Sequence, residues 1–112
     1  MSARRWSGLR LARAALLGSA LLVANAARGE LVQIPLPHGT PIQAHWLPAP
    51  GADGPRPTVV ALHGCGGLYR RDGRTLDARY PDYAQRLHAE GWHVLLPDSF
   101  GSRGEGSQCT KK

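Results

Sequence analysis

The first 13 residues contain no acidic side chain, although they carry four arginines, Arg4, Arg5, Arg10 and Arg13. From Ala27 onward ten basic residues face eight acidic ones, which leaves a net charge of only +2. Nucleic-acid binding requires a clustered basic face on the folded domain. The distribution therefore argues against a nucleic-acid partner and assigns the excess charge to a targeting segment.

No long hydrophobic run is present either. The longest, Ala14 to Ala24, is 11 residues, whereas a transmembrane helix needs about 20. A basic start, a short apolar run and the small residues Ala24 and Ala26 together predict a signal peptide over residues 1–26, cleaved before Ala27. This interpretation is favoured over an uncleaved membrane anchor or an Arg-rich transit peptide. It predicts passage through the export machinery to the periplasm or the medium.

Histidines with metal-ligand spacing are also lacking. The five histidines show no ligand spacing or accompanying carboxylate pattern that would suggest zinc. The sequence contains no internal repeat. The exported part, residues 27–112, has only two cysteines, Cys65 and Cys109, in a compartment that permits a disulfide.

The sequence does contain a series of short segments whose patterns predict strands and a helix. Two alternating runs, Leu31 to Leu36 and Ile42 to Leu47, are separated by turn residues and predict a hairpin. Thr58 to Leu62 and Trp92 to Leu96 are continuously apolar and predict strands buried on both faces. Between these two strands, Tyr80 to Glu90 has helical periodicity.

A strand, a helix and a second apolar strand form a parallel crossover unit. The sequence therefore predicts an α/β fold in which an antiparallel hairpin precedes a parallel β-α-β unit. The first crossover strand leads into a glycine loop, His63 to Gly67, which has three glycines in four residues. Such a composition favours neither helix nor strand.

The glycine loop belongs to a longer pattern of sequence motifs. The strand and glycine loop from Val59 to Gly67 are similar to the His-Gly-x-Gly loop of esterases. Together with the segments Leu68 to Arg74, Tyr80 to Tyr83 and Leu95 to Gly104, they resemble exported members of the dienelactone hydrolase family. The resemblance covers about Ile34 to Thr110 and matches only the first third of a family member. Polyester depolymerase-type esterases share a similar strand and loop.

The resemblance implies the N-terminal portion of an α/β-hydrolase fold, with an incomplete sheet, over residues 27–112. It implies a small ester or lactone as substrate, with no metal or organic cofactor. Ester hydrolysis passes through a tetrahedral oxyanion, which preorganised backbone N–H groups stabilise. In this fold one donor follows the third strand, so Cys65 and Gly66 are the candidates, acting through their main-chain N–H groups. The alternative is a tight turn without a catalytic role.

No Ser or Cys in the sequence meets the spacing requirement of a nucleophile elbow. A nucleophile elbow requires small residues two positions before and two positions after the Ser or Cys. Cys65, Ser99 and Ser102 have glycine two positions after them, but His, Pro or Phe two positions before. We expect the nucleophile, its acidic partner and the catalytic His to lie beyond Lys112, with His63 serving as a structural hydrogen-bonding residue. Cys65 is the strongest rival nucleophile.

Three residues carry further expectations. Cys65 and Cys109 follow the two buried strands, which the resemblance makes neighbours, so they either form a disulfide or remain free thiols. Arg103 follows the second strand and either contacts a substrate carboxylate or is a solvated loop charge.

Two functions follow from the sequence. The first is an exported dienelactone hydrolase-like ester or lactone hydrolase, of which this chain holds half of the oxyanion hole but not the triad. The second is a small exported binding or structural protein that the Cys65–Cys109 bridge stabilises. Because the nucleophile is missing, the isolated chain is expected to hydrolyse no ester.

Overall fold

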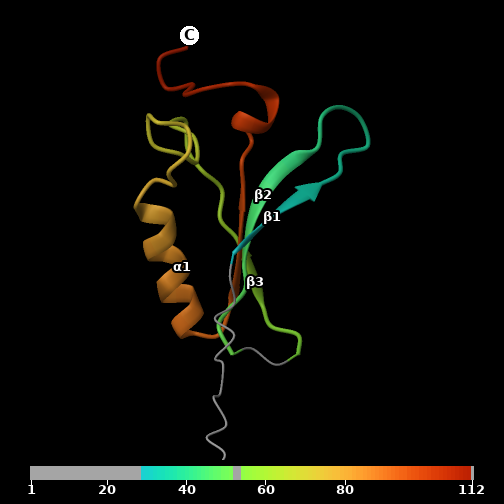
Figure 1. Cartoon of the computed structure of the whole chain (residues 1–112), viewed down its shortest axis with the longest axis vertical. Coiled ribbons are helices and arrows are strands. Elements are labelled where there is room, and N and C mark those ends of the chain that lie inside the picture. The colour runs from blue at the N-terminus through green and yellow to red at the C-terminus, as the bar shows by residue number, and fades with distance from the viewer. Residues whose placement is uncertain (1–28, 52–53, 112) are drawn as a thin grey trace, which may run out of the picture.

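The computed structural model describes residues 29–51 and 54–111. A mixed four-stranded sheet, one α-helix and a short 3-10 helix form the fold (Figure 1). In chain order the elements are β1 (Glu30–Ile34), β2 (Ile42–Leu47), β3 (Thr58–Val60), α1 (Arg79–Ala89), β4 (His93–Pro97) and η1 (Gly101–Arg103).

The sheet has the strand order β1-β2-β4-β3. β1 and β2 form the predicted antiparallel hairpin, in which Val32 faces Ala44. β3 and β4 pair in parallel, with Val59 beside Val94, and α1 connects them. The α/β class and the hairpin followed by a parallel β-α-β unit are therefore confirmed. β4 also pairs antiparallel with β2, which joins the two motifs into one sheet.

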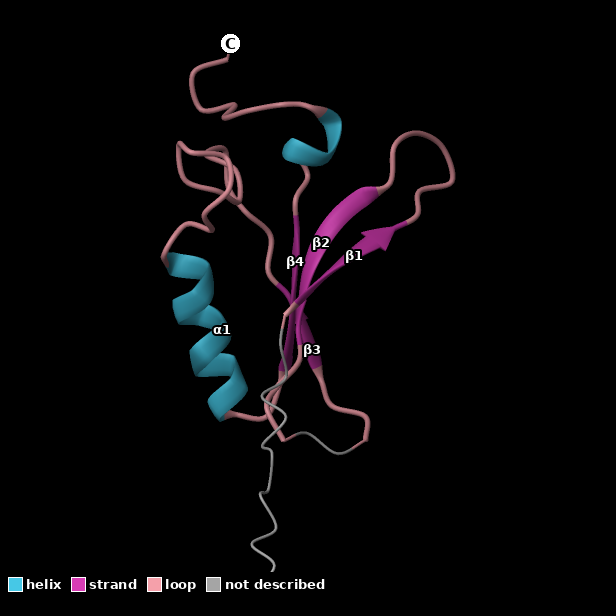
Figure 2. Cartoon of the chain, viewed as in Figure 1, coloured by secondary structure: helices cyan, strands magenta, loops and turns pink. Residues whose placement is uncertain are grey.

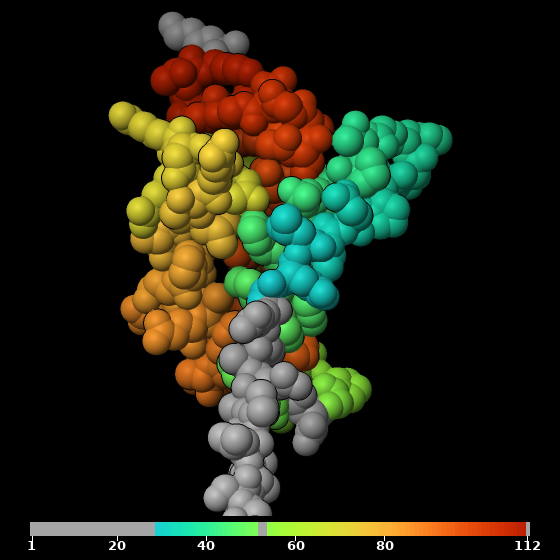
Figure 3. Space-filling view, viewed as in Figure 1, coloured from blue at the N-terminus to red at the C-terminus, as the bar shows by residue number. Residues whose placement is uncertain are grey.

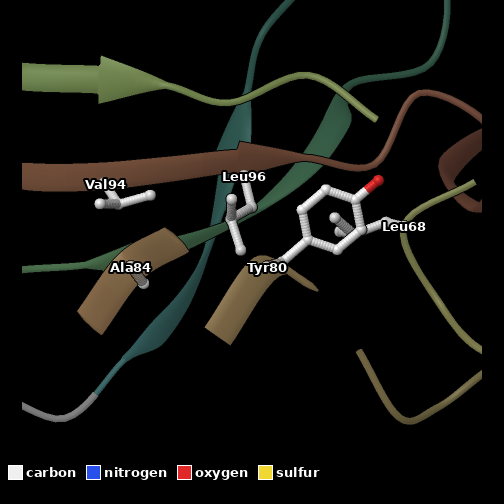
Figure 4. Close-up of a cluster of buried hydrophobic side chains, with 5 residues drawn as sticks. All are labelled: Leu68, Tyr80, Ala84, Val94 and Leu96. Atoms are coloured by element: carbon white, nitrogen blue, oxygen red, sulfur yellow. The ribbon is translucent and has the colours of Figure 1, made fainter. Parts of the chain in front are cut away.

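The hydrophobic core lies between α1 and one face of the sheet (Figure 2). Val94 and Leu96 alternate along β4 and are fully buried, because alternate residues of a strand point to the same face. From the helix side they meet Tyr80 and Ala84, while Leu68 closes the end of the cluster nearest the glycine loop (Figure 4). This cluster fixes the position of β4 relative to the helix.

The helix follows its sequence pattern closely. α1 runs from Arg79 to Ala89 and buries Tyr80 and Ala84, as the apolar spacing predicts. Gly91 follows just after its C-cap, Glu90; the φ of Gly91, 77°, is in the left-handed region, and its N–H donates to the carbonyl of His88. Glycine adopts this conformation without the strain that a side chain would add.

One expectation about β3 is wrong. The sequence predicts a strand through Leu62 that is buried on both faces, but β3 ends at Val60, and Val60 and Leu62 are 53% and 72% exposed. Only Val59 and Ala61 face the helix side, where Ala61 packs against the core. The physical reason is coverage: successive side chains of a strand point to opposite faces, and within the described residues α1 covers only the face that carries Val59 and Ala61.

The predicted signal peptide, residues 1–26, lies outside the described residues. Among residues 29–51 and 54–111, no helix has both the length and the apolar character that a membrane span needs.

Candidate functional site

The glycine loop forms a tight turn just after β3. The N–H of Gly67 donates to the carbonyl of Gly64 at 3.0 Å, so Cys65 and Gly66 occupy the two central positions. Gly67 has a φ of 86°, whereas Gly64 and Gly66 are not among the glycines with positive φ. The turn therefore requires a glycine at 67 but not at 64 or 66.

The two amides at the centre of this turn have no acceptor within the described part of the chain. No hydrogen bond from the N–H of Cys65 or Gly66 is formed there. The carbonyl of Cys65, by contrast, accepts the N–H of Gln108 at 2.8 Å and the hydroxyl of Ser107 at 3.3 Å. The loop is thus held through its carbonyl group while its donors stay available.

A cleft of about 700 Å³ adjoins the glycine loop. The loop contributes Gly66 and Gly67, the next segment contributes Tyr69 and Arg70, and the end of β4 contributes Asp98. A smaller hollow of about 290 Å³ also adjoins the loop and is bordered by Cys65 and Gly66. Gly66 therefore borders both spaces, whereas Cys65 borders only the smaller one.

His63 connects the two loops at this end of the sheet. Its Nε2 lies 3.0 Å from the N–H of Ser99, which can only donate, so Nε2 is the acceptor. The ring hydrogen is then on Nδ1, which donates to the carbonyl of Gly64 at 2.9 Å. The ring also meets Phe100 edge-on, with centroids 4.6 Å apart. Both nitrogens serve the fold, as expected of a structural histidine.

Cys65 and Cys109 form a disulfide, with their Cα atoms 4.8 Å apart. This is the pairing that the sequence leaves open beside free thiols. A disulfide sulfur has no thiolate, and the thiolate is the nucleophilic form of cysteine. Cys65 in this state is therefore no nucleophile, although its backbone N–H is unaffected.

Arg103 lies at the end of η1. Its Nε donates to the carbonyl of Ser99 at 2.8 Å, its side chain is exposed, and it is not among the residues that line the cleft. The structure thus gives Arg103 a backbone partner beside the cleft. Contact with a substrate carboxylate remains a prediction.

Asp98 is a cleft residue that the sequence analysis missed. It is only 4% exposed, and its Oδ1 accepts the N–H groups of Gly101 at 2.9 Å and Phe100 at 3.3 Å. An Asp that is followed within three residues by Gly at a strand end is a known turn signal, because its carboxylate binds the backbone ahead of it. That signal was present in Asp98 to Gly101.

A second missed pair lies at the side of the cleft. The hydroxyl of Tyr69, which lines the cleft, is 2.7 Å from Nε2 of His45 on β2. Burial raises the pKa of Tyr69, and the nearby charge of Asp98 raises it further. Burial lowers the pKa of His45, and Asp98 partly opposes that change. Both shifts favour neutral groups, so a neutral tyrosine hydroxyl is hydrogen-bonded to a neutral imidazole.

No cluster of three or more His, Cys, Asp or Glu side chains within residues 29–51 and 54–111 is arranged to hold a metal ion. Comparison with known protein families finds no family model that matches the chain. Comparison with solved structures also finds no match.

Proposed function

We propose that this chain carries the N-terminal part of an exported hydrolase that cleaves carboxylic esters or lactones, resembling the dienelactone hydrolase family. In this proposal the N–H groups of Cys65 and Gly66 supply one half of the oxyanion hole. The observation that carries the proposal is that neither amide has an acceptor within the described residues, while Gly66 borders the cleft and Cys65 borders the smaller hollow. Preorganised donors without a partner in the chain are what a developing oxyanion requires.

The glycine at 66 gives independent support. The turn does not require it, because Gly66 is not among the residues with positive φ. Packing does not require it either, since a Cβ placed at Gly66 would meet no atom within 4 Å. Open space over an unpaired amide suits a ligand that must approach the backbone closely.

The arrangement of strands also supports the proposal. An antiparallel hairpin that leads into a parallel crossover is the beginning that the α/β-hydrolase resemblance implies, and the sheet has this arrangement. The loops after β3 and β4 lie together at the carboxyl-terminal end of the sheet, because β3 and β4 are parallel and end on the same side. In open α/β sheets, ligands bind at the carboxyl ends of the strands.

The test uses two proteins: the chain itself, and the chain continued through the coding sequence beyond Lys112 if that sequence encodes G-x-[CS]-x-G after an apolar strand. We expect no turnover of p-nitrophenyl acetate by the chain alone. In the continued protein, Gly66→Pro removes the donor and should lower kcat about 10²- to 10³-fold.

Gly64→Ala is the matched control, because a Cβ at Gly64 also meets no atom within 4 Å and the N–H of Gly64 is not a proposed donor, so this variant should retain most of the activity. Turnover by the chain alone that is lost in Cys65→Ala would overturn the proposal. So would equal activity of Gly66→Pro and the unsubstituted protein.

A second candidate is a small exported binding or structural module, which the disulfide favours, because small exported domains often depend on such bridges. The coding sequence beyond codon 112 discriminates between the two. An absent nucleophile motif together with cooperative thermal unfolding of the chain alone would favour the module.

A further inference from the structure

We infer that the Cys65–Cys109 disulfide is a thiol–disulfide exchange site whose reduction by a dithiol releases residues 105–109, here called the C-terminal strap, from the glycine loop. The inference does not depend on hydrolase activity, because it concerns only the segment that forms one wall of the cleft.

The C-terminal strap forms one wall of the cleft. Glu105, Gly106 and Ser107 line it, opposite the segment that contains Arg70 and Arg71. In the space-filling view the red C-terminal segment lies against the yellow segment that follows the glycine loop (Figure 3). Movement of the strap would therefore widen the cleft that Gly66 also lines.

Few interactions hold the C-terminal strap in place. At its start, the N–H of Glu105 donates to the carbonyl of Phe100 at 2.9 Å. At its far end, the hydroxyl of Ser107 and the N–H of Gln108 both donate to the carbonyl oxygen of Cys65 in the glycine loop. The side-chain bonds of Gln108 to Glu105 and Gly106 lie within the strap itself. The ion pair of Glu105 with Lys111 lies within the C-terminal segment and does not hold it to the loop.

Burial adds little to these bonds. Gln108 is half-buried, and the other strap residues, Cys109 included, are exposed. A hydrogen bond in water contributes only a modest net stabilisation, and ordering a chain segment has an entropic cost for each residue. The covalent bond is therefore the interaction that keeps the far end of the strap on the loop.

The disulfide is open to a reductant, because Cys65 and Cys109 are both exposed residues. Exposed disulfides are the more labile class. A thiolate of the dithiol attacks one sulfur and displaces the other as a thiolate. The second thiol of the reductant then resolves the mixed disulfide, so that Cys65 and Cys109 each gain a hydrogen and the dithiol becomes a cyclic disulfide.

The experiment follows amide hydrogen exchange in the ¹⁵N-labelled full chain at 10 °C, with and without dithiothreitol. Reduction should lower the protection of the Gln108 amide by at least about tenfold. The protection of the Val94 and Leu96 amides of β4 should stay within about twofold of its value in the oxidised protein, as expected for local opening. Reoxidation should restore the Gln108 value. The double variant Cys65→Ser/Cys109→Ser should match the reduced protein and show no response to dithiothreitol.

Ser107→Ala is the matched control, since it removes one hydrogen bond to Cys65 but keeps the disulfide. It should leave the Gln108 amide protected in the oxidised protein. Unchanged protection of Gln108 on reduction would overturn the inference, because the strap would then stay in place without the covalent bond. An equal loss of protection at Gln108 and in β4 would overturn it too, because the bridge would then stabilise the whole domain rather than the strap.

Discussion

Substituting alanine for each of two neighbouring glycines should change stability in opposite directions. Gly67 has a φ of 86°, a conformation that costs a residue with a Cβ about 1–2 kcal/mol. Its added Cβ would lie 3.6 Å from the Phe100 ring, an ordinary contact, so conformation alone sets the cost. Gly66→Ala meets no atom within 4 Å and should be neutral or stabilise by up to about 1 kcal/mol, because it restricts the unfolded chain.

The assay is thermal and urea unfolding of both variants beside the unsubstituted chain. In a domain of this size 1 kcal/mol shifts Tm by about 4–8 °C, so a stability difference of about 1–3 kcal/mol between the two variants should separate their Tm values by about 4–24 °C. A Gly66→Ala variant as destabilised as Gly67→Ala would refute the reasoning. It would show that the turn itself needs glycine at 66, and the argument for a ligand at that amide would lose its basis.

Three further outcomes follow. Leu96→Ala, in the fully buried core, should lower the free energy of unfolding by about 2–5 kcal/mol in urea titrations, whereas Leu31→Ala, 56% exposed, should change it by less than about 0.5 kcal/mol. Asp98→Ala removes the buried carboxylate that accepts the N–H groups of Phe100 and Gly101 and should lower the free energy of unfolding by about 1–3 kcal/mol. Asp98→Asn, which keeps an acceptor oxygen, should lower it less in the same titrations. Hydrogen bonds from Thr75 and Arg74 lower the pKa of Asp72 from 3.8 to about 2. The stabilising contribution of Asp72 is therefore present above pH 3.8 and is lost as the pH falls toward 2. The Tm difference between the unsubstituted chain and Asp72→Asn should shrink over that pH range, and a constant difference would contradict this pKa shift.

The hairpin and the helix were predictable because their signals are local. β2 spans Ile42–Leu47, as its alternating pattern predicts, and α1 begins and ends within one residue of its predicted range. Turn residues, apolar spacing and a terminal glycine specify such elements within a few positions of sequence. Burial of β3 was not predictable in this way, because it depends on which strands and helices lie beside it.

The residues around the cleft likewise divide into those with a local sequence signal and those that only the fold brings together. The glycine loop was found from composition, but the contact of Tyr69 with His45 joins residues 24 positions apart and leaves no local pattern. The cysteine pairing stayed open for the same reason, since it depends on how β3 and β4 place their following loops. Asp98 had a local turn signal, and only its burial beside the cleft required the structure.

Hydrogen exchange at three consecutive amides tests the central claim most directly. In the oxidised chain, the N–H groups of Cys65 and Gly66 should exchange near the rate of an unstructured peptide, while that of Gly67, bonded to Gly64, should be measurably protected. Protection of Cys65 and Gly66 equal to that of Gly67 would mean that both donors are already engaged, and it would contradict their assignment to an oxyanion hole.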